Sequence, residues 1–172
     1  MKICLTGHRP SKMYGYDLSD ERWQNLKENL KAILRSYDCD EAISGMALGC
    51  DMAFALAVLE LKEEGMPIDL RCAVPVKGQE SKWNASDIRR YKQILEAADF
   101  VDILSEGPYK PYLMQERNKY TVDNSDVVIA VWDGGKGGTG NCVDYAVKQN
   151  KKIIYINPKE FKKENERNDE RW

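Results

Sequence analysis

Short apolar runs alternate along this chain with longer segments in which apolar residues recur every three or four positions. The short runs predict strands at residues 3–5, 41–44, 68–74, 100–104, 127–132 and 153–156. The longer segments predict helices over residues 19–37, 52–61 and 88–98, from about residue 111, and from the glycines after residue 132 to about residue 150. This alternation is typical of helices that cover both faces of a mostly parallel sheet, so we expect an α/β three-layer sandwich.

The length of 172 residues suits one domain with its own core, and we find no internal repeat and no interdomain linker. Residues 1–157 hold all the predicted strands and helices. Residues 158–172 are almost wholly charged or polar, so we expect them to form a charged C-terminal tail.

Charge and cysteine content exclude several classes of protein. The formal net charge is −2, which does not favour a nucleic-acid partner. The five cysteines form no CxxC pair and accompany a single histidine, so we expect neither disulfides nor a metal site. Because the N-terminus lacks a signal-peptide pattern and no apolar run approaches the roughly 20 residues that span a bilayer, we expect a cytoplasmic protein without membrane partner or resident cofactor.

Polar and glycine-rich segments follow several of the predicted strands. Gly7–Arg9, Ser44–Met46 and Asp133–Gly134 each come directly after an apolar run. The carboxyl ends of parallel strands meet at one edge of a sheet, where open α/β sheets bind their ligands. The sequence therefore predicts that these segments gather into one site.

The strongest candidate is the glycine-rich segment Asp133–Asn141, which follows a strand and opens a helix. Glycines let backbone amides approach an anion, and a helix N-terminus adds partial positive charge. The spacing differs from the GxxxxGK[ST] motif of nucleotide triphosphatases. We expect a bound phosphate here rather than a merely flexible turn, with these candidate ligand-binding residues: Asp133, Gly134, Gly135, Gly138 and Thr139.

A second strand–turn–helix segment, Ser44–Asp51, contains two further glycines. Its backbone amides would approach another part of the same ligand. Asp51 has two interpretations of equal weight, a contact to the ligand or a cap on the following buried helix. The candidate binding residues in this segment are Ser44, Gly45, Met46, Gly49 and Asp51.

The turn after the first strand carries Gly7, His8 and Arg9, and Pro10 keeps a helix from starting at once. A guanidinium group suits a phosphate or carboxylate, so we include all three residues in the site. A surface salt bridge remains the alternative for Arg9, and a solvated turn position remains the alternative for His8.

Met114, Arg117 and Asn118 share one face of a helix that begins at the same edge. We take Arg117 and Asn118 as candidate ligand-binding residues. In the long loop before residue 84, Trp83 lies near Gln79 and has two interpretations: it packs the loop onto the domain, or it stacks on a base.

Taken together, these segments resemble the SLOG superfamily of Rossmann-like nucleotide-binding proteins over residues 1–157. Ser44–Asp51 resembles the phosphate loop of the DNA-processing protein A (Smf) family. Met114-x-x-Arg117-Asn118, followed by a strand and the glycine cluster, resembles the LOG phosphoribohydrolases. The opening Thr6–Pro10 and the segment from Val74 to Trp83 are most similar to the YpsA branch. The resemblance implies a Rossmann-like fold and, because related proteins are often homodimers, a homo-oligomer.

LOG enzymes hydrolyse the N-glycosidic bond of nucleoside 5′-monophosphates with an arginine and a glutamate of GGxGTxxE. Arg117 matches that arginine and is our one candidate catalytic residue. Either Asn141 or Cys142 takes the place of the glutamate, depending on which glycines are aligned, and Asp144 would point away from the site. Asp133 replaces a proline of those enzymes and would contact a ribose hydroxyl or cap a turn.

Three functions are compatible with this pattern. The leading hypothesis is binding or sensing of a nucleotide-derived small molecule, such as a nucleoside monophosphate or an ADP-ribose-like compound. The alternative is a nucleotide N-glycosidase that uses His8, Arg117 or Asp144 as acid–base groups. The third is a DNA-interaction module, which the acidic pI of about 5.6 disfavours.

Overall fold

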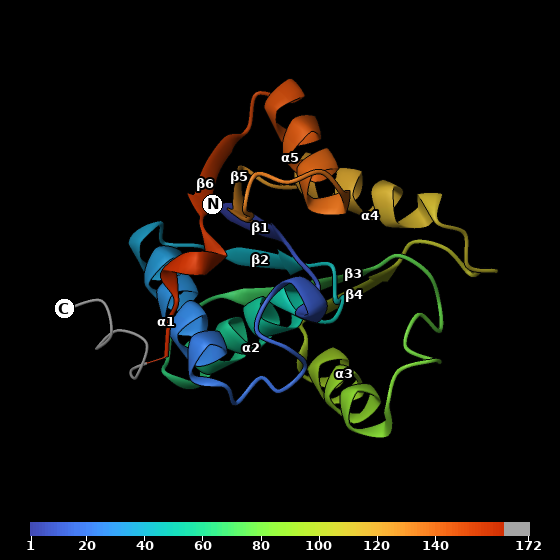
Figure 1. Cartoon of the computed structure of the whole chain (residues 1–172), viewed down its shortest axis with the longest axis horizontal. Helices are drawn as coiled ribbons and strands as arrows, with labels where there is room; N and C mark the ends of the chain where they lie inside the picture. The colour runs from blue at the N-terminus through green and yellow to red at the C-terminus, as the bar shows by residue number, and fades with distance from the viewer. Residues whose placement is uncertain (164–172) are drawn as a thin grey trace.

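The computed structural model describes residues 1–163 and confirms the α/β three-layer sandwich (Figure 1). In this part of the chain the strands form one all-parallel sheet in the order β4-β3-β2-β1-β5-β6. The strands are β1 (Lys2–Gly7), β2 (Glu41–Ser44), β3 (Asp69–Val74), β4 (Phe100–Ile103), β5 (Val127–Val131) and β6 (Lys152–Ile156). The helices are α1 (Glu21–Ser36), α2 (Cys50–Glu63), α3 (Ala85–Ala97), α4 (Tyr112–Asp123) and α5 (Gly138–Lys148). Each lies within a few residues of its predicted position.

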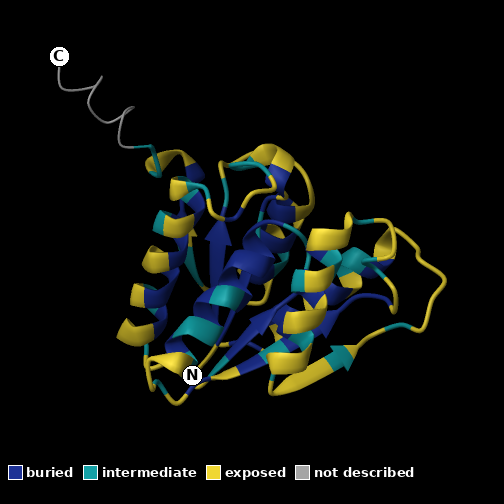
Figure 2. Ribbon diagram, turned by 90° about the horizontal axis from the view of Figure 1, so that it is seen from below, coloured by how far each residue is buried: buried dark blue, intermediate teal, exposed yellow. Residues whose placement is uncertain are grey.

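Helices α1, α2 and α3 cover one face of the sheet, and α4 and α5 cover the other (Figure 1). Successive residues of β1 point to opposite faces, as a strand requires. Ile3 and Leu5 join the large core beneath α1–α3, whereas Cys4 joins the smaller core beneath α4 and α5. Strand β5 is buried along its whole length because helices cover both of its faces, in agreement with its unbroken apolar sequence (Figure 2).

The site is positioned by the point where the chain reverses its direction across the sheet. Strand β5 pairs with β1 over the full length of β5. The chain leaves β1 toward α1 and β2, on one side, and leaves β5 toward α5 and β6, on the other. Because the two connections diverge, a crevice opens at the carboxyl ends of β1 and β5.

Residues 157–163, which follow β6, pack against the rest of the domain. Pro158 is buried, its carbonyl oxygen accepts a hydrogen bond from the Tyr14 hydroxyl, and Phe161 packs against the large core. Residues 164–172 of the predicted tail lie outside the described residues. No helix within residues 1–163 combines the length and the apolar character that crossing a bilayer demands.

Asp20 caps the N-terminus of α1 and gives a first testable prediction. Its carboxylate accepts hydrogen bonds from the Arg22 backbone amide at 2.9 Å and from the Arg22 guanidinium at 3.0 Å. These bonds lower the pKa of Asp20 from 3.8 to about 2. We expect Asp20→Ala to reduce the free energy of unfolding by about 1 kcal/mol near pH 7.

Because the pKa of Asp20 is lower in the folded state, its contribution is fully present above about pH 4 and is lost as the pH falls toward 2. Urea unfolding of wild type and Asp20→Ala across this range should therefore show the difference shrinking with acidification. Asp20→Asn, which keeps a capping oxygen, is the control. A difference that does not vary with pH would contradict this description of the cap.

Candidate functional site

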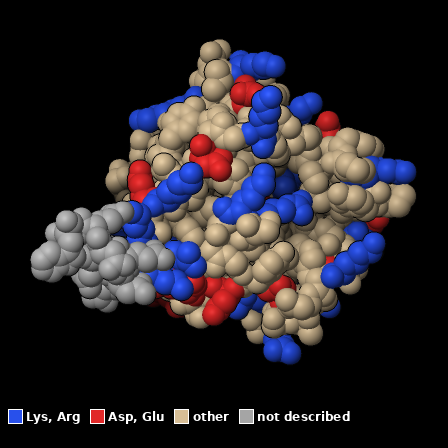
Figure 3. Space-filling view, viewed as in Figure 1, with Lys and Arg blue, Asp and Glu red and all other residues tan. Residues whose placement is uncertain are grey.

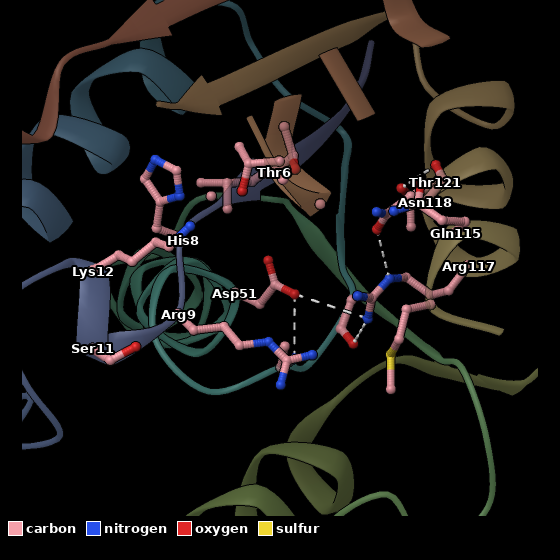
Figure 4. A pocket seen from close by; sticks show the side chains of 18 residues that line it. Thr6, His8, Arg9, Ser11, Lys12, Asp51, Gln115, Arg117, Asn118 and Thr121 are labelled. Carbon is pink, nitrogen blue, oxygen red and sulfur yellow. Dashed lines mark hydrogen bonds and ion pairs between the residues drawn. The ribbon is translucent and has the colours of Figure 1, made fainter. Parts of the chain in front are cut away.

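A pocket of about 290 Å³ occupies the crevice at the carboxyl ends of β1 and β5 (Figure 4). Four segments that are distant in sequence line it: the end of β1 with the following turn, the β2–α2 loop, one face of α4, and the first turn of α5. The lining includes these predicted site residues: Gly7, His8, Arg9, Gly45, Asp51, Arg117, Asn118, Gly138 and Thr139. The structure therefore brings together residues from all the predicted segments.

The charged side chains that line this pocket are mostly basic. Arg9, Lys12 and Arg117 contribute cationic side chains, and Asp51 is the single carboxylate among the lining residues. Figure 3 shows basic side chains gathered around a hollow on this face of the molecule. A concave surface of one sign concentrates the opposite charge, so the pocket favours an anion.

Arg117 and Asp51 form a buried ion pair at the base of the pocket. Their side chains are only 7% and 10% exposed, and Arg117 Nη1 lies 3.9 Å from Asp51 Oδ2 (Figure 4). Burial raises the pKa of Asp51, while the positive charge of Arg117 opposes that shift. Burial also lowers the pKa of Arg117, and the charge of Asp51 opposes it. Each charge thus favours the ionised form of the other group, against the effect of burial.

Most of the Arg117 guanidinium is engaged by the protein itself. Nη1 donates to the Gly45 carbonyl oxygen, and Nε donates to Asn118 Oδ1 at 2.9 Å. A Cβ atom at Gly45 would lie 2.5 Å from Nη1, so any larger residue there would displace the guanidinium. Nη2 has no hydrogen bond within residues 1–163 and is not sealed from solvent, so it is the atom that can meet a ligand.

The β2–α2 loop is shaped by residues that do not line the pocket. Ser44 Oγ donates to the Asp51 carbonyl oxygen at 2.8 Å and accepts from the Met46 amide at 3.2 Å. The Met46 side chain is fully buried in the large core, and Gly49 packs against the His8 carbonyl. Ser44, Met46 and Gly49 therefore position the loop, whereas Gly45 and Asp51 reach the cavity.

Asp51 ties the same loop together from inside the first turn of α2. Its Oδ2 accepts a hydrogen bond from the Ala47 amide at 3.2 Å. The N-cap position of α2 belongs to Gly49 instead. The side chain thus combines parts of both interpretations of the sequence: it orders the loop at the helix start, and it faces the pocket.

The carboxyl end of β1 packs tightly against α2. A Cβ atom on Gly7 would lie 2.5 Å from the Cβ of Cys50, so only glycine allows this approach. His8 is buried, with Nε2 3.2 Å from Asp133 Oδ1. His8 therefore connects the end of β1 to the β5–α5 loop, while the exposed side chain of Arg9 extends beside the pocket (Figure 4).

Only the second half of the predicted glycine segment lines the pocket. Asp133 Oδ1 accepts from the Gly135 amide at 2.8 Å, which lowers the pKa of Asp133, so this side chain closes a turn. Asp133, Gly134 and Gly135 are not among the lining residues.

Gly138 and Thr139 form the first turn of α5, beside the cavity. The first amides of a helix have no partner within the helix, and none of the residues 1–163 accepts a hydrogen bond from these two. They are therefore available to an anion.

Several lining residues were not predicted from the sequence. Gln115 and Thr121 lie three positions before and after Asn118 on α4, so extending the helical spacing would have found them. Lys12 lies in a short 3₁₀ turn, Pro10–Lys12, which no pattern in the sequence distinguishes from a loop.

The positions that replace the LOG glutamate do not contribute to the cavity. Asn141 and Asp144 are exposed, Cys142 is buried in the smaller core, and none of the three lines the pocket. No cluster of His, Cys, Asp or Glu side chains suited to a metal ion occurs within residues 1–163.

Comparison with known proteins gives consistent matches. The family model described as "YspA SLOG family" matches residues 3–162. The SPβ prophage-derived protein YoqJ of Bacillus subtilis is 36% identical over 72% of this chain and 81% of its own length. The UPF0398 protein YpsA of the same organism is 27% identical over 80% of this chain and 78% of its own.

Among solved structures, DNA processing protein A (DprA) of Streptococcus pneumoniae has a similar fold, with a TM-score of 0.60 and 14% sequence identity. The match covers 91% of this chain but only half of the DprA chain. It therefore supports the Rossmann-like architecture alone.

The buried ion pair gives a second prediction. Arg117→Met would leave Asp51 buried without its counter-charge, so we expect a loss of about 3–5 kcal/mol in the free energy of unfolding. The double variant Arg117→Met/Asp51→Asn should recover a substantial part of that loss. Arg35→Met, which removes an exposed partner of Glu64, should cost no more than about 1 kcal/mol.

The loss in Arg117→Met should also depend on pH. Asp51 has a raised pKa when folded, so the variant is relatively more stable at acid pH and loses stability as the pH rises through that pKa. Chemical denaturation of all four proteins between pH 4 and pH 8 measures both effects. Equal stability of the single and double variants at neutral pH would refute the pairing.

Proposed function

This chain belongs to the YpsA family of SLOG proteins, and on that premise we propose that it binds a nucleotide-derived small molecule through a phosphate group. Candidate ligands are a nucleoside monophosphate or an ADP-ribose-like compound. The protein would report the presence of the ligand rather than convert it.

The observation that carries this proposal is the convergence of amides and cations on one cavity. The unpaired amides of Gly138 and Thr139 lie at the N-terminus of α5, beside the side chains of Arg9, Lys12 and Arg117. Helix N-termini favour phosphate oxygens because their N–H groups and partial charge act together. Guanidinium groups add charge-assisted hydrogen bonds of matching geometry.

Binding is favoured over hydrolysis because the one carboxylate in the lining already has partners within the protein. Asp51 accepts a hydrogen bond from Ala47 and pairs with Arg117, so it is engaged in holding the pocket together. Hydrolysis of an N-glycosidic bond requires a carboxylate that can stabilise positive charge on the sugar. A compact pocket also suits one small anion better than a nucleic-acid strand, which needs a row of phosphate contacts.

We also propose that the protein is cytoplasmic and assembles into a homo-oligomer. Five buried, free cysteines support a reducing, cytoplasmic environment. The edge strand β4 exposes Phe100, Val101 and Ile103, which supports assembly into a homo-oligomer.

Gly138→Glu provides a direct test of the anion pocket. A Cβ atom at this position has Gln115 Nε2, at 3.9 Å, as its nearest neighbour, so the backbone here accommodates a side chain. We expect AMP or ADP-ribose, at 100 times its dissociation constant, to stabilise the wild type by about 2.7 kcal/mol and to raise its Tm. Gly138→Glu should remove that shift because its carboxylate would lie where the phosphate binds.

Val147→Glu is the matched control, because it adds the same charge to an exposed position of the same helix, outside the pocket. Its shift should equal that of the wild type. Equal shifts in Gly138→Glu, or no shift with any nucleotide in a broad panel, would contradict the proposal. Chromatography of the same mixtures tests the alternative, since free base would reveal an N-glycosidase.

A further inference from the structure

A second cavity adjoins the pocket described above, and we infer that it receives the nucleobase of the ligand. This inference rests on the proposed function and specifies which part of a nucleotide each compartment holds. We call the first cavity the anion pocket and the second, of about 350 Å³, the aromatic pocket.

The two cavities adjoin each other. They share four lining residues, namely Arg9, Ser11, Ala47 and Met114. One molecule can therefore occupy both, with its sugar beside these shared residues. The order phosphate, sugar, base along a nucleotide matches the order anion pocket, shared wall, aromatic pocket.

The lining of the aromatic pocket suits a flat, uncharged ring. Tyr16, Trp83 and Tyr109 line it together with the apolar side chains of Leu48 and Val76. Nucleobases stack on aromatic side chains, because every base presents a π face.

Trp83 is held in place before any ligand arrives. It packs against the large core and meets the Tyr91 ring edge-on, with ring centres 5.3 Å apart. Both interpretations of this residue from the sequence are thus compatible with the structure, since it anchors its loop and also lines the cavity. Because a fixed ring loses little freedom on binding, it forms a prepared stacking surface.

Gln79 adds a polar group that can recognise the edge of a base. Its Nε2 donates to the Met46 carbonyl oxygen at 3.2 Å and lies 3.3 Å from the Tyr91 hydroxyl. These contacts fix the amide, whose Oε1 has no hydrogen bond within residues 1–163 and is not sealed from solvent. That oxygen can accept a hydrogen bond from an N–H group of the base.

The charge of the aromatic pocket is also compatible with the neutral base of an anionic nucleotide. The aromatic pocket contains the cations Arg9, Lys77 and Lys82 and no carboxylate among its lining residues. A cationic ring would be repelled there, whereas the neutral base of an anionic nucleotide is not.

Calorimetric titration with three kinds of probe separates the two compartments: ribose 5-phosphate, which lacks a base; the monophosphates AMP, GMP, CMP and UMP; and adenosine, which lacks the phosphate. We expect the tightest monophosphate to bind at least about tenfold more strongly than ribose 5-phosphate, because stacking adds to phosphate binding. Adenosine should bind more weakly than AMP because the anion pocket stays empty.

Three tyrosines supply matched variants, since all are highly exposed and none is needed for the core. Tyr16 and Tyr109, at 57% and 56% exposed, line the aromatic pocket, whereas Tyr112, at 63%, lines neither cavity. We expect Tyr16→Leu and Tyr109→Leu to weaken the tightest monophosphate by about fivefold or more and to leave ribose 5-phosphate unchanged. Tyr112→Leu should change neither. Gln79→Leu should weaken the monophosphate only.

The outcomes distinguish this inference from the proposed function. If the monophosphates and ribose 5-phosphate bind equally, or if Tyr109→Leu and Tyr112→Leu behave alike, the aromatic pocket does not hold the base, although the anion pocket stands. If neither the monophosphates nor ribose 5-phosphate binds, the proposed function itself fails.

Discussion

Strands β1 and β5 lie side by side in the sheet, yet the helices that follow them cover opposite faces. The backbone leaves a crevice open at the carboxyl ends of these two strands, because the chain leaves β1 toward one side of the sheet and leaves β5 toward the other. Every feature of the site depends on that divergence. It lets the first turn of α5, the turn after β1 and the β2–α2 loop face one another across a cavity that no helix fills.

The polar groups at the base of the cavity have partners within the protein. Arg117 reaches from α4 to the Gly45 carbonyl and lies beside Asp51 on α2, so one side chain connects both faces of the sheet. A buried pair of this kind is a weak source of stability, since the cost of desolvating the two charges consumes most of their attraction. Its role here is positional: it fixes the β2–α2 loop and leaves Nη2 without a hydrogen-bond partner among residues 1–163.

The sequence was sufficient for the fold because each element is specified locally. The unbroken apolar run of β5, the periodic apolar face of α1 and the glycines after β2 and β5 identify strands, helices and turns without knowledge of the rest. Parallel topology then places every strand-to-helix turn at one edge. That single rule brought Arg9, Gly45 and Gly138 into the same site.

The roles of individual residues were less predictable, because they depend on contacts between distant parts of the chain. Ser44 and Met46 lie in a segment typical of a binding loop, but their side chains face away from the cavity: Ser44 bonds to the Asp51 carbonyl oxygen and Met46 packs in the large core. Asp133 closes a turn and contacts His8, 125 positions away in the sequence. No local pattern reveals such a contact. The aromatic pocket likewise arises from loops whose spacing has no period, so only Trp83 and Gln79 could be singled out in advance.

The central claim is that the first turn of α5 and the nearby guanidinium groups hold a phosphate group. Titration of ¹⁵N-labelled protein with inorganic phosphate, followed by two-dimensional NMR, tests it at single residues. The amide signals of Gly138 and Thr139 should shift together with the Nε signals of Arg9 and Arg117, all following one binding curve, while Gly134 stays still. Shifts that are scattered over the surface, or an unperturbed first turn of α5 at saturating phosphate, would contradict the account.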